Sequence, residues 1–199
     1  MVSDPDAALM LAFQGGDESA FRTLFEKYGR SMVGYCNHFV KDTARAEELA
    51  QDVFLNLYRS ADRYQPTARF KTYLYRIASN HCLNELRRSE YSTRREVERT
   101  SDDGDAVVEP DALASDAATP EQTSMASALG AAVERLLARL PEKQRAAFVM
   151  ARFEGLSYDE IAEVLATTLP AVKSLVHRAT VAAATALAPF ASEAKEELP

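Results

Sequence analysis

The sequence predicts an all-α protein made of two small helical domains joined by a flexible acidic linker. Apolar residues recur at spacings of three and four on both sides of the linker, and no segment alternates as a strand does. Residues 98–125 contain no aromatic residue and many Ala, Ser, Thr, Gly and Pro, so they cannot bury enough apolar surface to order. The predicted domains are residues 1–97 and 126–191, and residues 192–199 form a polar tail.

The composition is that of a soluble globular protein, with 47% hydrophobic and 27% charged residues among 199. The N-terminus lacks the basic region of a secretory signal. The longest apolar stretch, residues 181–191, is too short to cross a bilayer. We therefore expect a cytoplasmic protein without membrane insertion.

The net charge of −7 comes from one segment, because the rest of the chain is neutral. Seven acids lie between residues 100 and 125 with no Lys or Arg among them: Asp102, Asp103, Asp105, Glu109, Asp111, Asp116 and Glu121. This segment is either a soluble tether or a mimic of nucleic-acid phosphates that follows a basic channel on a partner. The charge therefore does not argue against a nucleic-acid partner.

The first domain is expected to begin with three helices. A short helix over residues 6–14 ends at two glycines. Asp17 can cap a second helix, whose apolar residues continue to Phe39, and Asp42 or Thr43 can begin a third that runs to about residue 60. Pro66 then breaks the chain before a long basic helix.

This basic helix runs from Phe70 to Arg88 or beyond. Between Arg63 and Arg99 there are nine basic residues and four acids, a surplus of +5, with aromatic rings among them. Rings that stack on bases and cations that follow the backbone are what a single-stranded nucleic-acid surface requires. The alternative, rings in the core and solvated cations, is preferred for Phe70, Leu74 and Ile77 and left open for Tyr64, Tyr73, Arg76 and Asn80.

Residues 155–179 have the pattern of a helix-turn-helix, which indicates DNA binding. Ser157 can cap a helix with Glu160 three residues on, and Thr168 can cap the next helix, with Pro170 in its first turn. In the second helix an apolar stripe of Val172, Val176 and Ala179 can pack on Ile161 and Leu165. The polar side chains beside it suit a major groove: Lys173, Ser174, His177 and Arg178. An ordinary amphipathic hairpin is the alternative.

The chain shows no sign of a metal site, a cofactor or catalysis. Cys36 and Cys82 lie near His38 and His81, but residues 36 and 38 point to different faces of a helix. We expect buried thiols instead. No phosphate-cradling Gly loop and no catalytic constellation is present, so we expect no enzyme activity and no cofactor.

Three blocks resemble a group IV, or extracytoplasmic-function, sigma factor of bacterial RNA polymerase, in the sigma-70 family. Residues 46–59 resemble the family's Ala-Glu-Asp-Leu block in region 2, and residues 70–80 resemble its Phe-x-x-Trp-Leu block. Residues 140–145, followed by the helix-turn-helix, resemble region 4. The resemblance implies a region 2 helical bundle and a region 4 helix-turn-helix on either side of the linker.

The resemblance also implies site residues. The clamp helices of core RNA polymerase would bind Glu47, Glu48, Gln51, Asp52 and Phe54, and the polymerase flap would bind apolar residues of 147–153. The minus-ten promoter element would be held by Tyr64, Lys71, Tyr73, Arg76, Asn80, Asn84, Arg87 and Arg88, with Asn80 and the loop 64–69 holding a flipped base. The minus-thirty-five promoter DNA would be contacted by Lys173, Ser174, His177 and Arg178.

The sequence departs from the family pattern at four positions. Tyr73 replaces the usual Trp, Leu175 stands where Arg is common, and Ala166 and Pro170 stand where Gly is common. We expect a weak minus-thirty-five contact, because one phosphate-binding cation is lost. The implied function is promoter-specific transcription initiation under the control of an anti-sigma factor. The alternatives are a sigma-like decoy for an anti-sigma factor and a stand-alone helix-turn-helix regulator.

Overall fold

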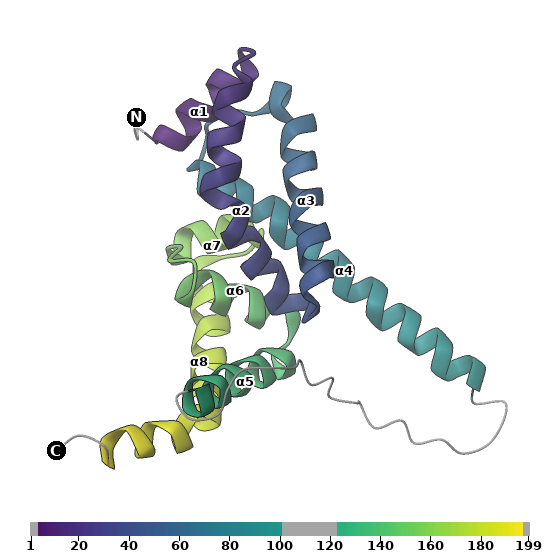
Figure 1. Cartoon of the computed structure of the whole chain (residues 1–199), viewed down its shortest axis with the longest axis vertical. Coiled ribbons are helices and arrows are strands. Elements are labelled where there is room, and N and C mark those ends of the chain that lie inside the picture. Colours follow the sequence, from purple (N-terminus) through teal and green to yellow (C-terminus); the bar gives the residue numbers. More distant parts are fainter. Residues whose placement is uncertain (1–3, 101–122, 197–199) are drawn as a thin grey trace.

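The structure is a computed structural model that describes residues 4–100 and 123–196. Within these residues every regular element is helical, which confirms the all-α prediction (Figure 1). The first half contains α1 (Pro5–Gln14), α2 (Glu18–Val40), α3 (Thr43–Arg59), the short 3-10 helix η1 (Ala61–Arg63) and α4 (Phe70–Thr100). The second half contains α5 (Thr123–Arg139), α6 (Glu142–Arg152), α7 (Tyr158–Val164) and α8 (Leu169–Glu196).

Helices cover both ends of the predicted linker. α4 continues to Thr100 and α5 begins at Thr123, so the helical segments extend three residues into each end of 98–125. The remainder of the acidic segment lies outside the described residues. α8 runs through Pro189 to Glu196, so helix also enters the predicted polar tail.

The helix starts predicted at Asp17, Asp42 and Ser157 are confirmed, and each is fixed by a local cap. The side chains of Asp4, Asp17 and Asp42 accept hydrogen bonds from backbone N–H groups in the first turns of α1, α2 and α3. At α7 the Ser157 hydroxyl and the Glu160 carboxylate form a reciprocal capping box.

Two acids near the N-terminus join α1 to the rest of the first half. Asp4 Oδ2 accepts a hydrogen bond from the backbone N–H of Phe70 at 2.6 Å, which satisfies one free donor at the start of α4. The buried Asp6 carboxylate accepts from the Tyr28 hydroxyl at 2.6 Å and from Lys27 Nζ at 2.6 and 2.7 Å. These acids hold α1 against both α2 and α4.

The core is rich in aromatic residues and continues from one half into the other. Tyr35, Phe70 and Tyr75 are completely buried, and the Tyr35 hydroxyl lies 2.7 Å from Ser79 Oγ. Cys36 and Cys82 are buried with their sulfur atoms 3.6 Å apart, as free thiols. The buried apolar residues of both halves form a single cluster. α6 and α7 lie directly against α4, and α5 lies against α2.

Candidate nucleic-acid and protein interfaces

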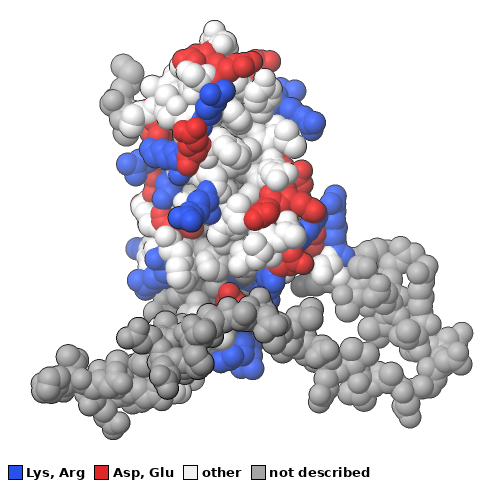
Figure 2. Space-filling model, in the orientation of Figure 1, with Lys and Arg blue, Asp and Glu red and all other residues white. Residues whose placement is uncertain are grey.

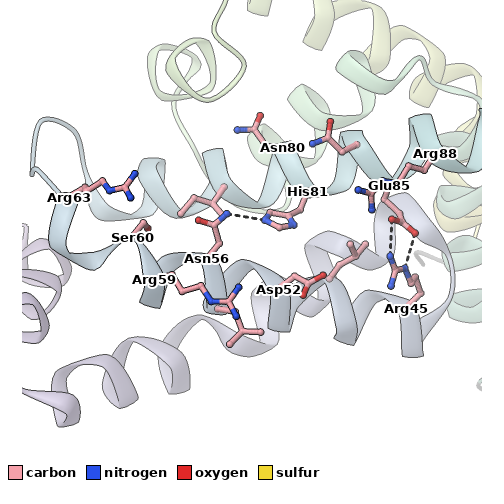
Figure 3. A pocket seen from close by; sticks show the side chains of 14 residues that line it. Arg45, Asp52, Asn56, Arg59, Ser60, Arg63, Asn80, His81, Glu85 and Arg88 are labelled. Carbon is pink, nitrogen blue, oxygen red and sulfur yellow. Dashed lines mark hydrogen bonds and ion pairs between the residues drawn. The ribbon is translucent and has the colours of Figure 1, made fainter.

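A polar groove of about 840 Å³ lies between α3 and α4. Figure 3 shows side chains from both helices along it, with Arg63 and Ser60 at one end and Arg45, Glu85 and Arg88 at the other. The exposed amides of Asn80 and Asn84 lie on the α4 side. The full lining is Arg45, Leu49, Asp52, Leu55, Asn56, Arg59, Ser60, Arg63, Ile77, Asn80, His81, Asn84, Glu85 and Arg88.

One end of the groove is closed by a bidentate ion pair. Arg45 Nε and Nη2 donate to the two Glu85 carboxylate oxygens at 2.7 and 2.8 Å, and Arg45 Nη1 donates to Glu48 at 2.6 Å. The hydrogen bonds from Arg45 hold the pKa of Glu85 below its usual range. Arg45 is therefore neutralised locally and contributes little positive charge to the groove.

The remaining cations of the groove are available to a ligand. Among the described residues, Arg59, Arg63 and Arg88 form no ion pair, and each lines the groove with its side chain at least partly exposed. His81 Nε2 lies 3.3 Å from Asn56 Nδ2, so the imidazole spans the floor between the two helices (Figure 3). Guanidinium groups beside free amides can hold phosphates and hydrogen-bond to base edges.

The structure brings together only part of the predicted minus-ten set. Asn80, Asn84 and Arg88 line the groove, and Arg87 is exposed on the same helix. Lys71 and Arg76 lie elsewhere: the Lys71 ammonium donates to the backbone carbonyl of Glu154 in the second half. The predicted residues are therefore divided between an open groove and a covered face.

The position of Tyr64 does not fit its predicted contact with the minus-ten element. Its ring is 3% exposed and packs against Phe70 and Tyr73, and burial raises the pKa of its hydroxyl to about 12. A side chain held in the core in this way has no free face for a base, so Tyr64 is a packing residue. The apolar body of tyrosine satisfies burial as well as stacking, which is why the sequence pattern left both open.

Tyr73 and Arg76 line a second, smaller cavity of about 360 Å³. The Arg76 guanidinium lies over the half-buried Tyr73 ring, 5.3 Å from its centroid, and the Tyr73 hydroxyl lies 3.1 Å from Ser60 Oγ. Glu163 of α7 also lines this cavity, so an acid of the second half shares it with a predicted DNA-binding cation of the first.

The predicted polymerase-binding residues on α3 also lie on two different sides of that helix. Glu47, Glu48, Gln51 and Asp52 are exposed, but Asp52 faces the α3–α4 groove, whereas Glu47 and Gln51 border a shallow cavity on the α2 side. Phe54 is 4% exposed, and its ring packs edge-on against Phe25 at 4.8 Å between centroids, where it lines the same cavities as Gln51.

The exposed apolar groups of this face are ones that the sequence analysis missed. Phe25, Leu55 and Tyr58 are each 46–50% exposed and line an apolar cavity of about 280 Å³ together with Gln51. Leu55 and Tyr58 lie off the apolar stripe of α3, which the core already uses. The signal in the sequence was that large apolar residues remain on α3 after its buried stripe has been assigned, and such residues indicate an exposed apolar surface.

The helix-turn-helix is confirmed in its local geometry. α7 and α8 are joined by a turn in which Ala166 has a left-handed φ of 47°, at the position where the family favours Gly. Val172, Val176 and Ala179 are buried, as predicted. The predicted DNA-facing side chains all lie exposed on the first turns of α8: Lys173, Ser174, His177 and Arg178.

The predicted flap residues are mostly core. Ala147, Phe148, Val149 and Met150 are buried in α6, so they are not open to a partner in this arrangement. Phe153 is half exposed, and its ring lies 5.0 Å from that of His38 on α2. Burial lowers the pKa of His38 below its ordinary value, and the charge of Glu134 opposes this shift only in part.

The described residues contain no cluster of three or more His, Cys, Asp or Glu arranged to hold a metal ion. None of the described helices is long and apolar enough to cross a membrane. Acidic and basic side chains lie beside one another on the face shown in Figure 2. That face therefore presents no large area of a single charge.

Comparison with known proteins gives the family. The family model for Sigma-70 region 2 matches residues 24–91, and that for Sigma-70, region 4 matches residues 130–181. The chain is 33% identical over 195 residues to the RNA polymerase sigma-H factor of Pseudomonas aeruginosa, covering 98% of this chain and 100% of that protein. It is 30% identical over 179 residues to the ECF RNA polymerase sigma-E factor of Haemophilus influenzae, covering 87% and 90% respectively.

Two solved structures share the fold at 21% identity each. The structure of CnrH in complex with the cytosolic domain of CnrY has a TM-score of 0.61, covering 98% of this chain and 100% of that chain. The sigma factor RpoE in complex with the anti-sigma factor NepR from Bartonella quintana has a TM-score of 0.51, covering 84% and 96%. With both matched regions in order and a relative matched along its whole length, the chain belongs to the extracytoplasmic-function sigma factors of the sigma-70 family, which direct promoter-specific initiation by bacterial RNA polymerase.

Proposed function

We propose that this sigma factor acts in the cytoplasm through three separate surfaces and does no covalent chemistry. The α3–α4 groove holds the melted minus-ten strand, the exposed face of α2 and α3 binds the clamp helices of core polymerase, and the start of α8 contacts the minus-thirty-five duplex. The observation that carries the proposal is the groove, because its amides and cations match the needs of an unpaired strand.

In the groove the proposed division of labour follows the side-chain chemistry. Asn80 and Asn84 offer amide donors and acceptors to the edge of an unstacked base, which gives selectivity. Arg59, Arg63 and Arg88 neutralise phosphates, which gives affinity without sequence information. The phosphate contacts run along the groove from η1 to α4.

The polymerase surface combines exposed rings with acids and an amide. Phe25, Leu55 and Tyr58 supply apolar area, and Glu47 and Gln51 border it. An apolar patch with a polar rim is typical of a protein-binding site. The acids complement the basic coiled coil that the family resemblance implies, and apolar residues of the second half around Phe153 would bind the flap.

At the minus-thirty-five element, four polar side chains of α8 enter the major groove of promoter DNA. Lys173 and Arg178 reach phosphates and base edges, and Ser174 and His177 supply hydrogen bonds. Leu175 is half buried and packs against the core, so it adds no phosphate contact on this face. The duplex contact is therefore expected to be the weaker of the two promoter contacts.

An anti-sigma factor is proposed as the regulator of this chain. Both solved neighbours were captured in complexes, one of them with a protein named as an anti-sigma factor. The exposed rings on α2 and α3 are a suitable target, because a protein that covers them blocks polymerase binding directly.

The test is run-off transcription with core polymerase and this protein on a promoter library. We expect products from a defined subset of templates, and none from any template would refute the proposal. A decoy for an anti-sigma factor would fail to compete for core in a pull-down assay. A stand-alone regulator would bind duplex DNA tightly without polymerase.

A further inference from the structure

The loop of residues 64–69 joins η1 to α4 and forms few hydrogen bonds within itself. Most of its side chains are exposed. In the described structure its backbone forms one internal hydrogen bond, from the Thr67 N–H to the Gln65 carbonyl at 2.8 Å. Pro66 has no N–H to donate. A short exposed segment of this kind depends on contacts at its two ends for a fixed shape.

Gln14, the last residue of α1, holds the first end of this loop. Its side-chain Nε2 donates to the carbonyls of Ala61 and Asp62 at 3.0 Å each and to that of Tyr64 at 3.4 Å. In the described part of the chain no backbone N–H donates to the carbonyl of Asp62 or of Tyr64. An amide has two N–H groups for these three carbonyls, so the longest of the contacts is a shared one. The turn from η1 into the loop therefore depends on a side chain of α1.

Asp4, the cap residue at the other end of α1, holds the second end of the loop. Its Oδ1 accepts a hydrogen bond from the Asp6 N–H at 3.1 Å and so caps α1. Its Oδ2 accepts from the Phe70 N–H at 2.6 Å, at the point where the loop enters α4. The dipole of α4 also favours a carboxylate at this position. One side chain from each end of α1 thus bonds to one end of the loop.

The aromatic side chains at the two ends of the loop add packing to these polar contacts. Tyr64 and Phe70 are 3% and 0% exposed, and their ring centroids lie 6.3 Å apart. The buried Tyr64 hydroxyl has no hydrogen-bond partner among the described residues. The Tyr64 ring therefore holds this end of the loop by packing, and the polar contacts that hold its backbone come from Gln14.

We propose that Gln14 and Asp4 are positioning residues for base selection at the minus-ten element, because they hold the loop 64–69 in the shape that receives an unstacked base. The inference rests on the proposed minus-ten function, and neither residue lines the α3–α4 groove. Arg63 does line it and lies where η1 leads into the loop (Figure 3). A base is distinguished only when the groups that read it are held in place, and a loop that is ordered beforehand loses little further freedom on binding.

The variants that test this role change hydrogen bonds and keep side-chain shape. Gln14→Glu has nearly the same shape but no N–H to donate, whereas Gln14→Lys restores donors through an ammonium group. Asp4→Asn leaves one acceptor oxygen, which can still cap α1, so the Phe70 N–H loses its charged acceptor. The matched control is Gln144→Glu. It is the same chemical change at a partly buried residue of α6 whose side chain forms no hydrogen bond with the described residues.

The experiment is run-off transcription by the holoenzymes on an active template and on derivatives that carry each other base at its most selective minus-ten position. The ratio of transcript from the preferred base to transcript from the others measures discrimination, and competition for core polymerase measures core affinity. We expect Gln14→Glu and Asp4→Asn each to lower discrimination about fivefold, as the loss of one hydrogen bond would, with core affinity within about twofold of wild type. Gln14→Lys and Gln144→Glu should match the wild type in both measurements.

Wild-type discrimination by both Gln14→Glu and Asp4→Asn overturns the positioning role. A fall in core affinity that equals the fall in transcription overturns it as well, because that result indicates a general loss of structure. The positioning role and the proposed function fail in different ways. Transcripts from every holoenzyme with unchanged discrimination reject only the positioning role, whereas no transcript from the wild-type holoenzyme on any template rejects the proposed function itself.

Discussion

Replacing Ala166 by Gly is expected to stabilise the protein. Ala166 is exposed and has a φ of 47° in the turn between α7 and α8, so no packing contact opposes the change. The left-handed conformation costs a non-glycine residue about 1–2 kcal/mol. Gly removes this strain but loses about 0.5–1 kcal/mol more conformational entropy on folding. The net gain is therefore up to about 1.5 kcal/mol, or at most roughly 3–6 °C in melting temperature for a chain of this size.

The measurement is thermal and urea unfolding of the full chain by circular dichroism. The matched control is Ala184→Gly, an exposed alanine inside α8, where the same chemical change should destabilise by roughly 1 kcal/mol. Opposite signs for the two variants support the argument. If Ala166→Gly lowers the melting temperature as Ala184→Gly does, the turn is not strained and the reasoning fails.

Other consequences concern the promoter contacts and one ion pair. Asn80→Ala should lower open-complex formation, measured by permanganate reactivity of melted thymines, without changing core binding; an equal loss of core affinity would show a structural role. Lys173→Ala and Arg178→Ala should each reduce the slope of log affinity against log salt by about one in holoenzyme binding, and an unchanged slope would exclude a phosphate role. Glu85→Gln should destabilise at neutral pH, because the folded pKa of Glu85 lies below its ordinary value of 4.5 and Arg45 stabilises the carboxylate. That difference should be full above the unfolded pKa and disappear as the pH falls through the folded pKa, and a difference that persists in acid would indicate packing instead.

Much of the fold was predictable because the signals are local. The caps at Asp17, Asp42 and Ser157 act within three residues of the helix that they begin, so the sequence alone identified them. The buried stripe of α8 was equally predictable, since helical spacing places its members on one side. The helix-turn-helix was predictable because its cap and its apolar stripe are both local signals.

The roles of the rings and of the interface were not predictable in the same way. A ring among cations satisfies either burial or base stacking, and only tertiary packing assigned Tyr64 to the core and Tyr58 to the surface. The pairing of Lys71 with Glu154 joins residues 83 positions apart, so no periodicity encodes it. Sequence reasoning accordingly found the elements that carry the site but not which of its residues are covered.

The placement of Asp4 and Asp6 makes the segment before α1 and its first turn a determinant of folding. A chain that begins at Met10 would lack the carboxylate that accepts from the Phe70 N–H and the one that bonds to the Tyr28 hydroxyl. Both donors would then lose their partners, and α1 would keep only its last turn and a half. Expression from an internal methionine, or cleavage by an aminopeptidase past residue 6, would weaken the helix that carries Asn80 without removing any residue of that helix.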